Sequence, residues 1–592
     1  MAPYCLEMRS KAMQLRQSNI EKLADGEVYD TLIIGGGING AVSAAALAGR
    51  GVKVGLVEQG DFAGMTSMWS SNLIWGGIKY MESRDFKLVR ELCVSRNHLI
   101  KHYPSTVQEI RFLTTITKGF RWHPLMLWAG TWIYWLFGNC FTRPPRLPSL
   151  STVNSEEPVI NTAPATGCFE YSDAFLHDND ARFVWNFVRT AMNSGCVAAN
   201  YVEATGFERQ GELWHVGLKD AMSGHEWTLK TKTLVNACGP LADRTNALAG
   251  KVTEHRHVLS KGIHLIVDRI TPHTRVLAFF DEDGRLFFAI PMGNRTCIGT
   301  TDTRTEDPHA AINDDDIKFV LDNINARLSL DKPLDRDDII ASRCGVRPLA
   351  VQNSSGNDRD FLQLSRKHEI DTDIDQGFIS IFGGKLTDCI NVGEEITELV
   401  SRMGIDIRFR DYRWYGEPVD AVRDEFFHQA SLMKLDDHTD PGASEPLSIR
   451  LWRRYAAYAI GILENIREDP RQAEILIEGT EYIRAEVRQA ARREMITKLE
   501  DFLRRRSKIS LVSRQQTIQQ SAGLMEACEI LFGDEAQMRF DEYFREHPVT
   551  NGIARDPGAG PLPARGATND PASEHEAQPP QSKEGDFETL NW

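Results

Sequence analysis

Few of the features that mark secreted, zinc-binding or nucleic-acid-binding proteins occur in this sequence of 592 residues. The ten cysteines are scattered and form no C-x-x-C pair, which argues against a disulfide framework or a zinc cluster and is typical of a reduced cytoplasmic protein. We therefore expect no metal site. Basic residues are in deficit too, since the net charge is −15, so we exclude nucleic acid as the main partner. An anionic substrate must then bind to a local cluster of positive groups.

Long apolar runs are also scarce. Residues 1–28 carry charges at their start and contain no apolar h-region, so we expect an amphipathic helical lead-in and not a secretory signal. The exception is Trp122–Thr142, which has four tryptophans and no Lys, Arg, Asp or Glu. Pro124, Gly130 and Gly138 interrupt it and tryptophan favours the membrane interface, so we favour an interfacial membrane-contact helix. A buried helix of a cap domain and a true membrane span are the alternatives.

The most informative segment is Tyr29–Gln59, where an apolar strand, a glycine-rich turn, an Ala-rich helix and a second strand follow one another. Gly35, Gly37 and Gly40 have the G-x-G-x-x-G spacing that lets a helix N-terminus approach a pyrophosphate. Glu58 lies 18 residues after Gly40, where a carboxylate can accept hydrogen bonds from an adenosine ribose. An ordinary glycine-rich turn leaves Glu58 unexplained. The segment therefore predicts a bound dinucleotide.

The rest of the chain has one region with strand patterns and one with helical patterns. Strand signals dominate Leu259–Thr303 and predict an antiparallel sheet of a substrate domain beside the nucleotide fold. From residue 414 onward, stretches rich in Arg, Glu, Ala and Leu predict an all-α C-terminal domain over 414–546. Residues 547–592 are rich in Pro, Gly and acidic groups and predict a disordered tail. The expected fold class is α/β, with an interleaved core over 29–413.

A flavin explains why the glycine motifs are separated along the chain. A helix that begins at 383–387 after the strand Phe378–Phe382 would direct its positive end at the flavin N1–C2=O region. Small residues in the loop 70–77 would let the backbone approach the ring edge. We therefore expect FAD to be bound by Gly35, Gly37, Gly40, Glu58, Ser70, Ser71, Asn72, Gly76, Gly77, Gly239, Gly383, Gly384, Leu386 and Thr387.

Several motifs together resemble one family. SSNLIWGGIKYME (Ser70–Glu82), KGIHLIV (Lys261–Val267), GTTD (Gly299–Asp302), GVRPL (Gly345–Leu349) and FGGKLTD (Phe382–Asp388) resemble the FAD-dependent glycerol-3-phosphate dehydrogenases, the membrane-associated, quinone-reducing type. LWRRYAAYAIGIL (451–463) and DFLRRRSKISL (501–511) resemble that family's C-terminal domain. The resemblance covers about residues 29–543. It implies a glycine-oxidase-like core, with FAD parts at about 29–80, 178–250 and 345–405 interleaved with substrate or cap parts at about 81–177 and 251–344.

The same resemblance implies a substrate site, and its residues are Lys79, Tyr80, His264, Arg347, Arg366 and Lys385. Arg347 and Arg366 would bind a phosphate, because a guanidinium offers a planar fork to two oxygens. His264 would be the polar group near the reacting hydroxyl, where a base of near-neutral pKa is needed. Taken alone, His264 is more simply a structural residue and Arg347 a turn residue. Lys385 at a helix start opposes the macrodipole, which indicates an anionic neighbour. We assign catalytic roles to His264, Arg347 and Lys385.

Three positions depart from the family pattern. Lys79 stands where the family has Arg, so a bidentate contact becomes a point charge. Trp75 stands where the family has His, and Lys367-His368 replace the acid and the phenol that follow the family's Arg. These departures affect the choice of substrate more than they affect the fold or the flavin.

The interpretation that follows is the oxidation of sn-glycerol 3-phosphate to dihydroxyacetone phosphate, with hydride transfer to flavin N5 and electrons passed to a membrane quinone. The protein would be cytoplasmic and bound peripherally to the inner membrane through residues 122–142. A homodimer is compatible with this interpretation. One alternative is a flavin oxidase or dehydrogenase that acts on another small hydroxy-phosphate or hydroxy acid. Another is a catalytically silent flavin-binding membrane scaffold.

Overall fold

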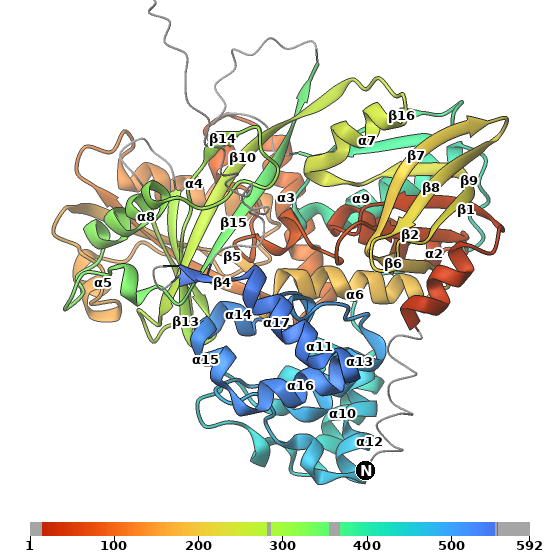
Figure 1. Ribbon diagram of the computed structural model, residues 1–592. Coiled ribbons are helices and arrows are strands. Elements are labelled where there is room, and N and C mark those ends of the chain that lie inside the picture. The colour runs from red at the N-terminus through yellow and green to blue at the C-terminus, as the bar shows by residue number, and fades with distance from the viewer. Residues whose placement is uncertain (1–14, 281–285, 354–366, 551–552, 555–592) are drawn as a thin grey trace, which may run out of the picture.

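Two large sheets and a group of C-terminal helices make up most of the described structure (Figure 1), and a small two-stranded sheet, β18 Val549–Thr550 with β19 Ile553–Ala554, follows the helices. The computed structural model describes residues 15–280, 286–353, 367–550 and 553–554. Residues 15–23 form a helix before the first strand. The eight-stranded and nine-stranded sheets lie side by side, and the C-terminal helices lie below them in the view. The predicted fold class, an α/β core with an antiparallel-rich second sheet and a helical C-terminal region, is confirmed.

The nucleotide-type sheet has the strand order β16-β17-β9-β1-β2-β6, with β8 paired to β9 and β7 to β8. Its strands are β1 Val28–Ile34, β2 Val54–Glu58, β6 Val197–Asn200, β7 Val202–Gln210, β8 Leu213–Asp220, β9 Glu226–Asn236, β16 Glu369–Asp373 and β17 Phe378–Phe382. β1 pairs in parallel with β2 and β9, and β17 pairs in parallel with β9. Such strands are buried on both faces, which is why their sequences are continuous apolar runs.

Three helices cover this sheet: α2 Ile38–Gly49, α6 Asp180–Asn193 and α9 Cys389–Arg402. The alanines of α2 are fully buried, and their small side chains let α6 and α9 pack closely against it. α2 begins directly after the first glycine turn, and α9 follows the second. The sheet therefore positions two helix N-termini near the ends of β1 and β17, two parallel strands on either side of β9, where open α/β sheets bind ligands.

The second sheet has the order β14-β10-β13-β12-β11-β4-β5-β3, with β15 paired to β10. Its strands are β3 Leu73–Ile74, β4 Val107–Thr117, β5 Ala165–Leu176, β10 His255–Asp268, β11 Arg275–Phe280, β12 Leu286–Met292, β13 Arg295–Gly299, β14 Thr303–Thr305 and β15 Ala341–Gln352. The predicted antiparallel pairing over Leu259–Thr303 is confirmed for β10 to β14. One pair, β11 with β4, is parallel. Helix α8 (Asp314–Arg327) packs on one face of this sheet.

The uncharged stretch 122–142 forms helix α4 (Pro124–Phe137), which lies against α3 (Phe86–His102) and the second sheet. The side chains of Thr131 and Tyr134 are buried. The opposite face exposes between 47% and 57% of each of the side chains Leu125, Met126, Ile133 and Leu136. The helix has 14 residues, whereas a span needs about 20. Among the described residues, no helix is long and apolar enough to cross a membrane.

The C-terminal region is helical from Asp420 to Glu546. Its longer helices are α10 Asp420–Leu432, α11 Leu447–Tyr455, α12 Ala459–Glu468, α13 Arg484–Arg493, α16 Ala522–Phe532 and α17 Ala536–Glu546. The shorter α14 (Ile509–Val512) and α15 (Gln515–Gln520) lie between them, and 501–506 is a π-helical turn. Buried ion pairs join the region to the core, such as Arg506 with Asp61 at 2.7 Å and Arg182 with Glu494 at 2.7 Å. Such pairs carry a desolvation cost, so they favour a single docking geometry.

Candidate active site

The first glycine turn has no room for side chains. Gly35 has φ +104°, and a Cβ there would lie 2.5 Å from the Ala237 carbonyl oxygen. A Cβ at Gly40 would lie 1.9 Å from the Gly35 carbonyl oxygen. Gly37 is the N-cap residue of α2 and offers no side-chain cap. The turn therefore leaves backbone amides at a helix N-terminus, which fits a pyrophosphate.

Glu58 ends β2 beside this turn. Its carboxylate accepts hydrogen bonds from the amides of Gly36 at 2.6 Å and Gly60 at 2.9 Å. Burial raises the pKa of the Glu58 carboxyl, and the two amides oppose that shift. Each carboxylate oxygen can accept a further hydrogen bond. Glu58 thus holds the glycine turn in place, and the predicted contact with the ribose remains a prediction that these free acceptor positions allow.

The loop 70–72 is held by residues that the sequence did not single out. Asp180 accepts a hydrogen bond from the Ser70 amide at 2.8 Å, and Arg343 donates one to the Ser70 carbonyl at 2.6 Å. The Asn72 side chain contacts Arg343 at 3.3 Å and the Asp178 carbonyl at 3.1 Å. Asn72 therefore fixes the loop through its side chain. Ser71 lies between these anchors and is partly exposed.

The second glycine turn lies beside the first. Gly383 and Gly384 have φ +65° and +101°, and the Asn39 side chain donates to the Gly383 carbonyl at 3.1 Å. The predicted helix start at 383–387 is a short 3-10 turn, Leu386–Asp388, that leads into α9. The Lys385 backbone is its N-cap. This contact brings together two predicted FAD segments that lie 344 residues apart in the sequence.

The remaining predicted residues of this turn and of the β9 end are placed nearby. Thr387 is buried and its hydroxyl donates to the Trp75 carbonyl at 3.3 Å, while Leu386 packs on the core beside the sheet. Gly239 starts a short turn after β9 with φ +53°, two residues after Ala237, whose carbonyl lies against Gly35.

The Lys385 ammonium lies between two aromatic rings. Its Nζ is 4.2 Å from the centre of the Tyr80 ring and 5.9 Å from the centre of the Trp75 ring. Such contacts stabilise a desolvated cation. Tyr80 and Lys79 belong to the 3-10 turn Ile78–Met81, which follows Gly77 at φ +77°. The turn after Gly76-Gly77 and the turn before α9 therefore meet at Lys385, as the predicted site requires.

The paired strands β10 and β15 supply the opposite wall. Ser260 pairs with Arg347 and His264 with Arg343, so these side chains alternate on one face. Arg347 donates to the Thr300 hydroxyl at 2.9 Å, and its guanidinium lies over Gly262, where a Cβ would be 2.3 Å from Nη2. The same strand pair contacts the segment just before the predicted flavin-contact loop 70–77. A Cβ at Gly345 would lie 2.7 Å from the Trp69 Cβ, and the Thr66 hydroxyl donates to the Val346 carbonyl at 2.6 Å.

His264 is 1% exposed, and neither ring nitrogen has a hydrogen-bond partner among the described residues. Burial lowers the pKa of His264 well below its ordinary value, and the Arg343 and Arg347 cations lower it further. The ring is therefore neutral at physiological pH and has one nitrogen that can accept a proton. A buried, unsatisfied imidazole is uncommon and calls for a bound partner.

Arg366 lies outside the described residues. Of the others, the structure brings Tyr80 and Lys385 into contact and places His264 and Arg347 on one sheet face. Arg343 was missed, although alternation along Ala341–Arg347 puts it on the same face as Arg347. Apart from their polar side chains, Asp180 and Asn39 have no sequence feature that would have predicted their role in holding these turns.

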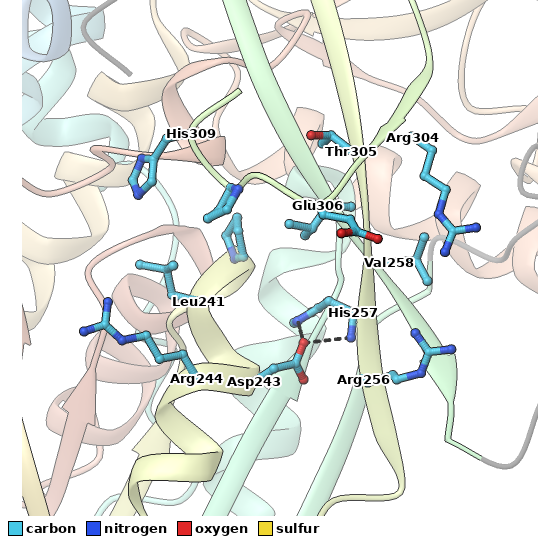
Figure 2. A pocket seen from close by; sticks show the side chains of 13 residues that line it. Leu241, Asp243, Arg244, Arg256, His257, Val258, Arg304, Thr305, Glu306 and His309 are labelled. Carbon is cyan, nitrogen blue, oxygen red and sulfur yellow. Dashed lines mark hydrogen bonds and ion pairs between the residues drawn. The ribbon is translucent and has the colours of Figure 1, made fainter. Parts of the chain in front are cut away.

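A separate cavity of about 500 Å³ opens beside the second glycine turn (Figure 2). Arg244, Arg256 and Arg304 are among the residues that line it. Asp243 and His257 face one another there: the His257 amide donates to Asp243 at 2.9 Å, and His257 Nε2 accepts from the Gly383 amide at 3.1 Å. These contacts of His257 lower the pKa of Asp243, against the effect of burial. None of the predicted site residues that the structure describes lines this cavity.

Comparison with known proteins identifies the family of the chain. Residues 30–388 match the family described as FAD dependent oxidoreductase, and residues 420–533 match the C-terminal domain of alpha-glycerophosphate oxidase. The chain is similar to glycerol-3-phosphate dehydrogenase 2 of Mycobacterium tuberculosis, at 30% identity over 507 residues and 82% of each protein. The chain belongs to the FAD-dependent oxidoreductases, within the glycerol-3-phosphate dehydrogenase family.

Other members of the family extend the comparison. The mitochondrial glycerol-3-phosphate dehydrogenase of Bos taurus is 30% identical over 402 residues, which is 64% of this chain and 54% of that protein. The crystal structure of the glycerol-3-phosphate dehydrogenase from Bacillus halodurans, complexed with FAD, matches with a TM-score of 0.68 and 24% identity, over 90% of this chain and 97% of that one. The fold is thus shared, and FAD is the cofactor of this flavoprotein.

Proposed function

We propose that this flavoenzyme oxidises sn-glycerol 3-phosphate to dihydroxyacetone phosphate and passes the electrons to a membrane quinone. The observation that carries the proposal is His264: a buried, neutral imidazole without a partner among the described residues, on the face that also carries Arg347. A base and a phosphate-binding cation on one sheet face suit a small hydroxy-phosphate. The names of the relatives agree with that substrate.

Substrate binding would use positive groups from separate segments. Arg347 offers its guanidinium beside Thr300, where it is a quarter exposed. Lys385 adds an ammonium held by Tyr80, and Lys79 adds a second on the neighbouring turn. A phosphate dianion is bound best by several charge-assisted donors. In a protein of net charge −15, these groups would have to supply the local positive potential that an anionic substrate needs, and Asp302, 3.6 Å from Arg347, offsets part of it.

His264 would accept the proton of the substrate hydroxyl at one ring nitrogen. Burial, and then the Arg343 and Arg347 cations, hold the pKa of His264 below the near-neutral value expected of the base, so the ring starts neutral, and the imidazolium that forms would have to pass its proton on before the next turnover. When bound, FAD would supply the two-electron acceptor for the hydride of the substrate carbon. Burial of His264 also keeps bulk water away from its ring.

Helix α4 would make the membrane contact. Its exposed side chains Leu125, Met126, Ile133 and Leu136 form an apolar surface, and Trp122 and Phe141 extend it at both ends. Tryptophan at the edge of such a surface suits a lipid interface. A membrane-bound enzyme could reach a quinone there. We therefore expect the variant with Leu125, Met126, Ile133 and Leu136 changed to Ser to lose vesicle binding in a flotation assay, while it keeps FAD.

The decisive test is anaerobic. The purified yellow protein is mixed with glycerol 3-phosphate, and the flavin absorbance is followed. Bleaching supports the proposal, and glycerol without the phosphate is the control that should not bleach it. Absence of bleaching with glycerol 3-phosphate contradicts the proposed substrate.

The electron acceptor is a separate question, because the C-terminal match is to an oxidase. A dioxygen-reducing enzyme is therefore the second candidate. After anaerobic reduction, the protein is exposed either to a quinone analogue or to air. Fast reoxidation by quinone and slow reoxidation by air support the dehydrogenase, whereas fast reoxidation by air with release of hydrogen peroxide supports the oxidase.

A further inference from the structure

The amide of Gly76 lies between the two aromatic residues that flank Lys385. Trp75 precedes it directly, and Tyr80 follows within the next turn. The Gly76 N–H donates to Asp173 Oδ1 at 3.1 Å. The backbone position of Gly76 therefore sets where both rings meet the Lys385 ammonium.

Asp173 is part of a buried network with an arginine and a tyrosine. Its side chain is fully buried, Arg96 Nη1 lies 2.6 Å from Oδ1, and the Tyr134 hydroxyl lies 2.8 Å from both carboxylate oxygens. Burial raises the pKa of Tyr134 well above its usual value, so the hydroxyl remains a donor. The network is tightly packed below the turn: a Cβ at Gly76 would lie 2.2 Å from the Tyr134 hydroxyl oxygen.

The network lies outside the substrate site itself, because Tyr134 belongs to helix α4 and Asp173 to strand β5. The network is connected to Lys385 through the Gly76 amide and the Trp75 and Tyr80 rings. A hydrogen bond to a buried charge is stronger than a neutral one, so removing the hydroxyl should let the turn shift.

We infer that Tyr134 and Asp173 are positioning residues for the substrate phosphate: they fix the Gly76 turn and thereby the place of Lys385 between Trp75 and Tyr80. The inference rests on the proposed function, since it takes Lys385 as a phosphate ligand. The network would therefore affect binding of the phosphate group, whereas His264 would act on the reacting hydroxyl.

The test compares Tyr134→Phe with Tyr201→Phe. Tyr201 is the matched control, because its buried hydroxyl also donates to a buried carboxylate, Asp501, at 2.8 Å, and it lies at the interface with the C-terminal helices. Both variants lose one such hydrogen bond. We expect Tyr134→Phe to raise the KM for glycerol 3-phosphate roughly tenfold and the Ki of inorganic phosphate in parallel, with kcat and FAD content unchanged. Tyr201→Phe should leave both constants at the wild-type values.

Equal KM values in the two variants would overturn the inference. Tyr134 would then contribute only to the stability of the fold. Asp173→Asn provides a second variant if Tyr134→Phe does not fold, because its amide oxygen still accepts from Gly76 but pairs less well with Tyr134 and Arg96. A raised phosphate Ki supports the inference there, and an unchanged Ki contradicts it. Failure of the proposed function is separate, since it appears first as absent flavin bleaching in the wild-type protein.

Discussion

The two ends of the proposed cofactor and substrate site are built from different parts of the chain. The adenosine end is made of backbone from one continuous segment, with Gly35 and Gly40 in contact and Glu58 holding the turn. The reacting end is made of side chains from four separate segments, including His264, Arg347 and Lys385. The first is encoded by local spacing, and the second exists only after the two sheets have packed together. Mutations should therefore affect flavin content at one end and substrate constants at the other.

The largest effect is expected at the adenosine end. Gly40→Ala should abolish FAD binding and folded yield, because the added Cβ would lie 1.9 Å from a backbone oxygen and the destabilisation should exceed about 4 kcal/mol. Gly461→Ala is the control, since a Cβ on that helical glycine meets no atom within 4 Å. Flavin absorbance relative to protein measures the outcome. Full flavin content in Gly40→Ala would contradict the assignment of the first glycine turn to FAD binding.

At the reacting end, His264→Asn should lower kcat by roughly 10²- to 10⁴-fold with FAD retained. Burial and nearby cations hold the pKa of His264 well below its ordinary value. The wild-type kcat/KM should therefore not fall as the pH is lowered from about 8 to about 6, where an ordinary histidine becomes protonated. His255→Asn, on the same strand β10, serves as the control. A loss of wild-type activity with an apparent pKa near 6.5 would argue against His264 as the base.

Arg347→Ala should raise the KM for glycerol 3-phosphate by roughly a hundredfold through the loss of charge-assisted hydrogen bonds, while kcat changes less. Arg347→Lys should recover part of the loss, because it keeps the charge without the planar fork. Arg304 pairs across from Ser260 on the other neighbouring strand and lines the cavity of Figure 2. Arg304→Ala should leave the KM unchanged. The reverse order of effects would place the phosphate in that cavity.

The smallest effect concerns pH and stability. His368 lies 2.9 Å from both Asp388 and Glu395, and although burial opposes it, these two carboxylates raise the pKa of His368 to about 9. Because the folded pKa lies above the unfolded one, the stabilisation is complete below about pH 6.5 and is lost as the pH rises through about 9. His368→Gln should flatten the decline of the melting temperature over this range. A wild-type slope in that variant would exclude His368 as its cause.

The difference between the two ends also explains how much the sequence could predict. Gly35, Gly40 and the strand Phe378–Phe382 follow from local pattern, because turn sterics and apolar runs act over few residues. Lys385 could be singled out because a cation opposes a helix start. The anchors could not: Arg343 contacts Ser70 at a separation of 273 residues, and no local pattern encodes such a partner.

The C-terminal helices show a related limit. The helical composition that predicts the all-α domain runs without a break through 448–468, yet the structure has α11 and α12 separated at Ala456, where φ is +50°. Periodicity does not mark such a break, because both pieces keep an apolar face toward the same core. The stretch 484–506 is divided in the same way, into α13 and the π-helical turn that carries Arg505 and Arg506 toward Asp61.

Helix α4 has a practical consequence for protein engineering. Its outer face invites substitutions that improve solubility, but its inner face carries Tyr134 beneath Gly76. Changes at Leu125 and Met126, two helical turns away, should be tolerated by the enzyme in detergent-free buffer. Ile133 is the neighbour of Tyr134 in the chain, so changes there should be screened for substrate affinity as well as for yield.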